Sequence, residues 1–178
     1  MSVKFDPDAL MGQILAEFWK SLENDKGTRA ELRRCRSISE VAITPAFSRM
    51  CRQVEKLMPT NFPWESRLAA VLGLISHLDP NEKNTVLAKQ DNGKYVELFI
   101  EPMTYLSGDR PILSELRFRR LLQREKNDLY PAMIRVLRLL GGNANLFGLA
   151  ESVFYWGDKI RKRWAFAYFP NVPEKKSA

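Results

Sequence analysis

The chain has 178 residues, of which 45% are hydrophobic and 28% charged, a composition that excludes disorder and allows one core or two small subdomains that share an interface. Its 28 Lys and Arg against 21 Asp and Glu leave a net charge of +7, which predicts an acidic partner such as nucleic acid or an anionic membrane surface. The longest apolar run, residues 68–78, is too short to cross a bilayer, and the first residues do not resemble a signal peptide, so a cytoplasmic location is expected.

The first two predicted helices differ in character. Asp6-Pro7 predicts a capped start for an apolar helix that continues to about Leu22. Thr28 and Glu31 have capping-box spacing, which predicts a short second helix. Four arginines are predicted on that short helix, and they leave it a polar role: Arg29, Arg33, Arg34 and Arg36.

Two more helices complete a predicted N-terminal bundle. Thr44-Pro45 predicts the start of the third, which has Phe47 on its apolar side and Arg52 on the opposite side. Cys51 also lies on the apolar side, and it is expected to stay reduced, as is Cys35. The fourth runs from Trp64 to the Asp79-Pro80 break and is apolar enough to be the central helix.

The helical period disappears after Pro80. Between Val86 and Ile100, β-branched and aromatic residues flank Asp91-Asn92-Gly93, which is typical of a hairpin. An isolated hairpin is only marginally stable, so we interpret residues 80–110 as an irregular insertion or connector.

The C-terminal part carries the net charge. Residues 110–163 contain twelve Lys and Arg and five Asp and Glu, and the remaining charges cancel. A basic helix is predicted from about Leu113 to Leu129, with Phe118 on its apolar side and an arginine ridge formed by Arg117, Arg120 and Arg124.

Two further helices are predicted beyond this ridge. Pro131 should open a helix that presents Arg135 and Arg138 outward and stops at Gly141-Gly142. A long last helix should bury the side from Leu146 to Trp164, and its outward side should carry Tyr155, Asp158, Lys159, Lys162 and Arg163. The residue pattern thus predicts an all-α protein of two small helical subdomains that share a core: residues 1–79 and 111–170, with a disordered tail at 171–178.

The sequence lacks the usual constellations of an enzyme. His77 is the only histidine, and neither a metal-ligand cluster nor a phosphate-binding glycine loop is present. The carboxylates are scattered rather than gathered as a two-metal site requires. We therefore expect no catalysis and no cofactor, and interpret the arginine faces as a surface for a phosphate backbone.

Several segments together resemble the CasB family, the small subunit of the type I-E CRISPR surveillance complex Cascade. In the N-terminal half they are FWKSL at 18–22, RAELRR at 29–34 and PAF at 45–47, and in the C-terminal half RFRRLL at 117–122, LRLL at 137–140 and WG at 156–157. The resemblance implies a non-catalytic, all-α subunit that is present in two copies. It also implies contacts with the backbone and large subunits, the crRNA hybrid and the displaced strand of the target DNA.

The matching positions implied to contact nucleic acid are Arg33, Arg34, Arg117, Arg119, Arg120, Lys159 and Arg161. The arginine-rich faces add Arg29, Arg52, Arg124, Arg138 and Lys162 to the expected nucleic-acid-binding residues. The alternative to a nucleic-acid-binding subunit is a structural adaptor, whose basic faces would contact acidic protein surfaces. A helix-turn-helix repressor is a weaker one, because residues 116–124 offer only Gln123 for reading base edges.

Overall fold

The computed structural model describes residues 2–80 and 93–174, and its regular secondary structure is almost entirely helical. The α-helices are α1 (Leu10–Ser21), α2 (Lys26–Arg34), α3 (Ile38–Ala42), α4 (Pro45–Val54), α5 (Glu65–Ile75), α7 (Tyr95–Ile100), α8 (Glu115–Leu122), α9 (Lys126–Leu139), α10 (Leu146–Phe154) and α11 (Asp158–Tyr168). Short 3-10 turns cover Glu55–Leu57, Glu101–Thr104 and Phe169–Asn171. The strands β1 (Leu106–Ser107) and β2 (Arg110–Pro111) form a small antiparallel hairpin with Leu106 opposite Pro111. The predicted all-α fold class is confirmed.

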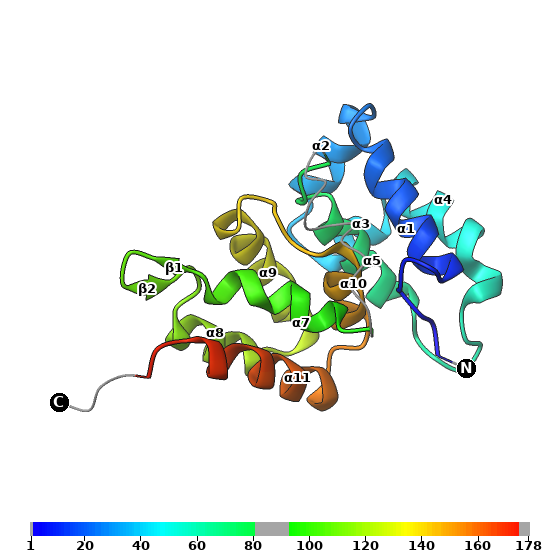
Figure 1. Ribbon diagram of the computed structural model, residues 1–178. Helices are drawn as coiled ribbons and strands as arrows, with labels where there is room; N and C mark the ends of the chain where they lie inside the picture. The colour runs from blue at the N-terminus through cyan, green and yellow to red at the C-terminus, as the bar shows by residue number, and fades with distance from the viewer. Residues whose placement is uncertain (1, 81–92, 175–178) are drawn as a thin grey trace.

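Helix α5 was predicted to be the central helix of an N-terminal bundle, and it contacts helices of both halves of the chain. Residues 68–75 are all buried, and α3 and α10 pack directly on this helix. Helices α1 to α4 lie toward one end of the molecule, while α8, α11 and the hairpin lie toward the other (Figure 1). One continuous core includes side chains from both halves of the chain, among them Leu72, Phe99 and Trp164.

Local capping signals explain some helix ends and fail at others. The Thr44 hydroxyl accepts a hydrogen bond from the Phe47 amide at 3.2 Å, so the predicted start of α4 is confirmed. The predicted capping box at Thr28 is wrong, because α2 already begins at Lys26 and the Asp25 carboxylate accepts from the Thr28 amide. Asp6-Pro7 forms a turn ahead of α1 instead of capping it, since α1 begins only at Leu10.

The segment from residue 93 to 111 differs most from the sequence prediction. Residues 95–100, which carried part of the hairpin signal and were interpreted as irregular connector, form helix α7. Residues 81–92 of the predicted connector lie outside the described part. Val96, Phe99 and Ile100 are fully buried, so their helical spacing places one apolar face against the core. α7 and α10 approach so closely that only glycine fits at position 148: a Cβ added to Gly148 would lie 1.9 Å from the Tyr95 carbonyl oxygen. Burial against α10 thus outweighs the β-propensity of this segment.

The break between the first two helices of the C-terminal basic region lies earlier in the chain than predicted. α8 ends at Leu122 and α9 begins at Lys126, so Pro131 lies inside α9 rather than at its start. Buried Leu129, Tyr130 and Met133 flank the proline, and their packing compensates for the backbone hydrogen bond that it cannot donate. α9 ends as predicted, with Gly141 and Gly142 at φ values of 65° and 75°.

The long last helix predicted from residue 146 is two helices, α10 and α11, with a break at Trp156-Gly157. Trp156 is turned toward the α8–α9 connection, where its indole Nε1 donates to the Arg124 carbonyl oxygen at 2.8 Å. This contact requires the chain to leave the helical path between Phe154 and Asp158.

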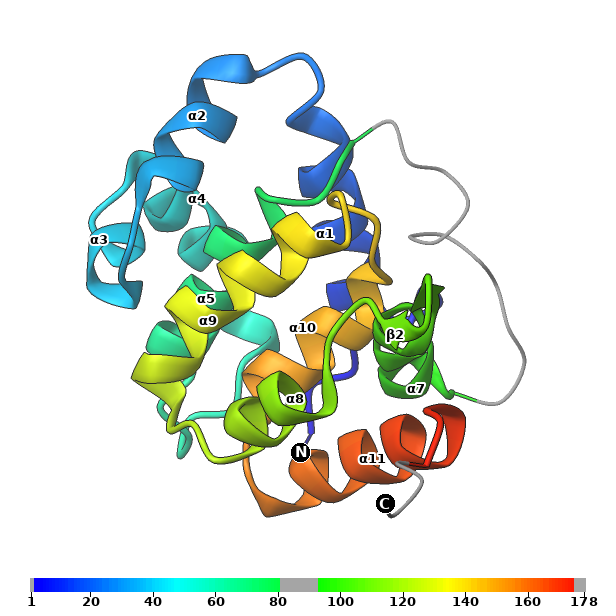
Figure 2. The ribbon, with the colours of Figure 1, turned by 90° about the vertical axis from the view of Figure 1, so that its left-hand side faces the viewer.

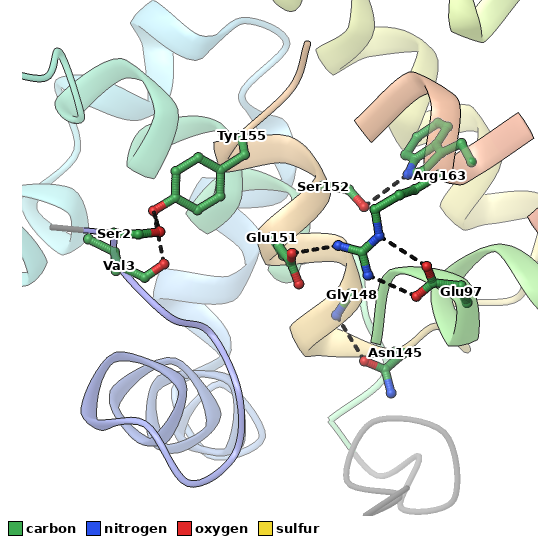
Figure 3. Close-up of polar contacts among 10 residues, drawn as sticks. Ser2, Val3, Glu97, Asn145, Gly148, Glu151, Ser152, Tyr155 and Arg163 are labelled. Atoms are coloured by element: carbon green, nitrogen blue, oxygen red, sulfur yellow. Dashed lines mark hydrogen bonds and ion pairs between the residues drawn. The ribbon is translucent and has the colours of Figure 1, made fainter. Parts of the chain in front are cut away.

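Arg163 was expected on the outward side of the last helix, and the structure corrects this. Its guanidinium donates to both carboxylate oxygens of Glu97 on α7, at 3.0 and 2.9 Å, and to Glu151 on α10 at 2.8 Å (Figure 3). Next to it, the Trp164 indole donates to the Ser152 hydroxyl at 2.9 Å. Arg163 therefore joins three helices and is a structural residue rather than a surface cation.

Candidate nucleic-acid interface

A groove runs between α8 and α9. Its volume is about 520 Å³, and its walls combine arginines with aliphatic side chains. The lining residues are Leu113, Arg117, Arg120, Leu121, Arg124, Ala132, Arg135, Val136, Arg138 and Leu139. The ridge of Arg117, Arg120 and Arg124 predicted from helical spacing thus faces a second helix that is also arginine-rich.

A second hollow, of about 370 Å³, lies between the C-terminal end of α2 and α9. It is lined by Arg33, Arg34, Cys35, Arg36, Pro131, Ile134, Arg135 and Arg138. Arg135 and Arg138 line both hollows, so α9 connects the N-terminal arginines with those of α8. In Figure 2, α9 lies between α8 and the N-terminal helices, in agreement with this arrangement. We call the eight lining arginines the arginine groove: Arg33, Arg34, Arg36, Arg117, Arg120, Arg124, Arg135 and Arg138.

The arginine groove is a concentrated positive surface. All eight arginines are exposed, and no Asp or Glu is among the described residues that line either hollow. Ion pairs within residues 2–80 and 93–174 involve Arg119, Arg161 and Arg163 but none of these eight. The eight guanidinium groups are therefore exposed and outside these ion pairs, which suits a surface that attracts a polyanion.

Three of the sequence-predicted site residues have structural partners instead. Arg119 pairs with Glu115 at 2.8 Å and lies over the Phe169 ring, so it is turned toward the α11 end. Arg161 donates to the Arg124 carbonyl oxygen and to the Glu125 carboxylate, and its guanidinium lies over the Trp156 ring. The contacts of Arg161 with Arg124 and Glu125 hold the connection between α8 and α9 in place.

Arg29 is the third of these residues. It is half-buried, and its Nη2 lies 3.5 Å from the Leu78 carbonyl oxygen. Burial and the neighbouring charge of Arg33 lower the pKa of its guanidinium. Arg29 thus lies at the junction of α2 with the chain after α5 and lines neither hollow.

The remaining predicted cations are exposed outside the groove. Arg52 lies on α4, and Lys159 and Lys162 lie on α11. None of the three lines the α8–α9 groove or the α2–α9 hollow. The structure thus divides the predicted set into six residues of the arginine groove and six outside it.

Two groove residues were absent from the predicted site. Arg135 is three residues before Arg138 on the same outward side of α9, and this spacing was a signal that could have included it. Arg36 was assigned to a helix, yet α2 ends at Arg34, and the Arg36 amide donates to the Glu40 carboxylate at 2.7 Å. The chain direction after α2 brings Arg36 to the hollow, and helical spacing alone does not reveal that.

His77 lies buried just after α5, beside the N-terminal arginines. Neither ring nitrogen has a hydrogen-bond partner among the described residues. Burial, then the positive charges of Arg33, Arg138 and Arg29, lower the pKa of its imidazole from 6.5 to about 4. The ring is therefore neutral near neutral pH, in a place where a further positive charge would be unfavourable.

We expect the free energy of unfolding to fall by about 2 kcal/mol between about pH 7 and about pH 5 because of His77. The unfolded chain binds a proton at this residue near 6.5 and the folded chain only near 4, so stability is lost as the pH falls through this interval. Urea denaturation at both pH values measures the loss. In His77→Asn the loss should disappear, and an unchanged loss in that variant would assign the titration to another group.

The fold and the groove together define a class of protein: a small all-α protein with one concentrated cationic surface and, among the described residues, no cluster of metal ligands. None of the described helices is long and apolar enough to cross a membrane. The family model of the CRISPR-associated protein Cse2 matches residues 28–169, and the chain therefore belongs to the Cse2 family. CasB is the same family under another name, so the resemblance found in the sequence is confirmed.

The fold is also similar to a solved structure. A chain of the crystal structure of E. coli Cascade bound to a PAM-containing dsDNA target, at 3.20 Å resolution, superposes with a TM-score of 0.59. The match covers 90% of this chain and 95% of that chain, at 16% sequence identity. At this identity the likeness shows a shared fold. No curated protein matches the chain by sequence.

Proposed function

We propose that this protein is a non-catalytic small subunit of a type I-E Cascade complex and binds nucleic-acid backbones through the arginine groove. The observation that carries the proposal is the gathering of eight exposed arginines, from both halves of the chain, around two hollows that share Arg135 and Arg138 and whose described lining includes no acidic residue. Membership of the Cse2 family supports the place of this subunit in the complex. The expected location is the cytoplasm.

The chemistry of the groove favours phosphate. Each guanidinium presents a fixed fork of donors that matches two phosphate oxygens, and successive arginines along a positive channel can hold successive phosphates. Such contacts bind any sequence equally. In the proposed complex, base pairing with the crRNA reads the target, while this subunit stabilises the hybrid and the displaced strand.

The proposed partners follow from this assignment. They are the crRNA, the target DNA with its displaced strand, the backbone and large subunits, and a second copy of this chain. Surfaces outside the groove remain for the protein contacts, and the exposed Lys159, Lys162 and Arg52 are available to them. The alternative, in which the arginine groove itself contacts acidic protein surfaces, gives different results in the following test.

We expect the groove arginines to determine the salt dependence of binding to a labelled single strand of about 20 nucleotides. The slope of log affinity against log salt should decrease by about 0.7 to 0.9 for each phosphate contact that a substitution removes. Arg33→Ala with Arg34→Ala should therefore reduce the slope by about one to two, and alanine at Arg117, Arg120 and Arg124 by about two to three. Combining all five should give about the sum, measured by fluorescence anisotropy from low to moderate salt.

The matched control removes three charges outside the groove: Arg52→Ala, Lys159→Ala and Lys162→Ala in one chain. This control should leave the slope nearly unchanged. All variants should keep the wild-type free energy of unfolding within a few tenths of a kcal/mol, because the substituted side chains are exposed. An equal decrease of slope in the control would mean that diffuse charge, not the groove, binds the strand.

A further inference from the structure

The groove between α8 and α9 has an aliphatic floor beneath its arginines. Leu113, Leu121 and Val136 line it with 2%, 4% and 4% of their surface exposed, whereas Leu139 is 45% exposed. Ala132 completes the floor from the α9 side. A site that held phosphate alone would need no such surface, because phosphate oxygens gain nothing from aliphatic contact.

The exposure of Leu139 indicates what the floor lacks. Removing apolar surface from water is favourable, so an occupant with an apolar face would gain binding free energy by covering this leucine. The occupant must also be anionic at its edges, because Arg117, Arg120, Arg124, Arg135 and Arg138 surround the floor. A nucleotide unit combines both features: a flat base and a charged phosphate.

A single strand meets this requirement and a duplex does not. In a duplex the bases are stacked inside, and only phosphates, sugars and base edges reach the surface. An unpaired base can turn out of its stack and place its face on an apolar surface or against a guanidinium plane. The α8–α9 groove therefore suits an unpaired nucleotide better than a paired one.

We propose that the α8–α9 groove binds an unpaired nucleobase of a single-stranded nucleic acid on the floor formed by Leu113, Leu121, Ala132, Val136 and Leu139. This inference rests on the proposed function and specifies its ligand. The adjacent phosphates contact the arginines of α8 and α9, and the base covers Leu139. The described lining contains no Asn, Gln, Ser or Thr, so the floor accepts bases by shape and stacking rather than by amide or hydroxyl hydrogen bonds.

The α2–α9 hollow has fewer apolar lining residues than the α8–α9 groove, three against five. Its lining apart from the arginines is Cys35, Pro131 and Ile134, and its volume is smaller, at about 370 Å³ against about 520 Å³. Cys35 is buried, with 8% of its surface exposed. We therefore assign this hollow to backbone contacts and the α8–α9 groove to the base.

The test compares two oligomers of equal length and charge: a single strand of about 12 thymidine nucleotides and an abasic strand with the same sugar-phosphate backbone. The full chain should bind the thymidine strand on the order of tenfold more tightly, because only that strand can remove the apolar surface of Leu139 from water. In Leu139→Ser the two strands should bind with nearly equal affinity, and the salt slope should stay unchanged. The matched control is Leu116→Ser, since Leu116 is 57% exposed on α8 but does not line the groove.

Two results would overturn this inference. The first is equal affinity for the abasic and thymidine strands, each with the salt slope that the arginines predict, which would leave the proposed function intact. The second is tighter binding of a leucine-containing acidic peptide of the same charge, with that advantage absent in Leu139→Ser, which would assign the floor to a protein partner. If neither strand bound with a measurable salt slope, the proposed function itself would fail.

Discussion

Replacing Arg163 by alanine should lower the free energy of unfolding by about 2 to 4 kcal/mol. The substitution leaves the carboxylates of Glu97 and Glu151 near each other with no cation between them (Figure 3). Removing one partner of a fully buried ion pair lowers the free energy of unfolding by about 3 to 5 kcal/mol. The three side chains here are partly exposed, which reduces the expected loss.

The same cluster predicts how the effect depends on pH. Burial opposes ionisation of Glu97, but hydrogen bonds from Arg163 and the charge of that guanidinium outweigh it and hold the pKa of Glu97 below 4.5. A carboxyl group whose pKa is lowered on folding stabilises the protein above its unfolded pKa, and this contribution is lost as the pH falls through the folded value. The difference between wild type and Arg163→Ala should therefore shrink below about pH 4.5.

Urea denaturation of three variants decides this prediction. Arg163→Ala with Glu97→Gln should be more stable than Arg163→Ala alone, because the second change removes one unpaired carboxylate. Arg135→Ala, an exposed arginine of the groove, is the matched control and should change stability by only a few tenths of a kcal/mol. If Glu97→Gln gave no recovery, the loss would come from side-chain packing rather than from uncompensated charge.

The sequence predicted those parts of the fold that depend on neighbouring residues. α4 has its cap, its proline and its apolar stripe within residues 44–54, and α5 is apolar over consecutive turns. The elements that it missed depend on distant contacts. α7 is helical because its apolar face is buried against α10 and α11, and α11 separates from α10 because Trp156 turns toward Arg124.

The same distinction explains the site. Helical spacing was enough to gather Arg117 and Arg120 on one exposed side of α8. It could not reveal which cations have partners far along the chain, such as Arg163 with Glu97, 66 residues apart, or Arg161 with Glu125, 36 residues apart. The partner of Arg119, Glu115, is four residues away, and that i, i+4 pair could have been predicted from the sequence.

Joining the two arginine-rich regions into one groove is a tertiary effect. Arg33 and Arg34 belong to the same groove as the α8 ridge because a third element lies between them. α9 is that element, because Arg135 and Arg138 line both hollows. Nothing in the spacing of residues 29–36 relative to residues 117–124 predicts that α9 lies between them.

In an assembled complex, alanine at Arg33, Arg34, Arg117, Arg120 and Arg124 should shorten the lifetime of the opened DNA by roughly 100-fold or more. A charge-assisted hydrogen bond is worth about 1.5 to 3 kcal/mol, and each 1.4 kcal/mol is a tenfold change, so removing even two such hydrogen bonds gives this factor. Gel filtration should show the variant subunit still in the complex. Strand-opening probes, which report the lifetime of the displaced strand, should show its rapid loss.

The chain with alanine at Arg52, Lys159 and Lys162 separates strand binding from assembly. If these three exposed cations contact protein subunits, their removal should reduce incorporation into the complex while the free chain keeps its affinity for single strands. The five-arginine variant should show the opposite behaviour, because its substitutions lie in the arginine groove. Should the five-arginine variant be missing from the complex while the free protein still binds DNA, the groove would be a protein contact. The adaptor function would then replace the one proposed here.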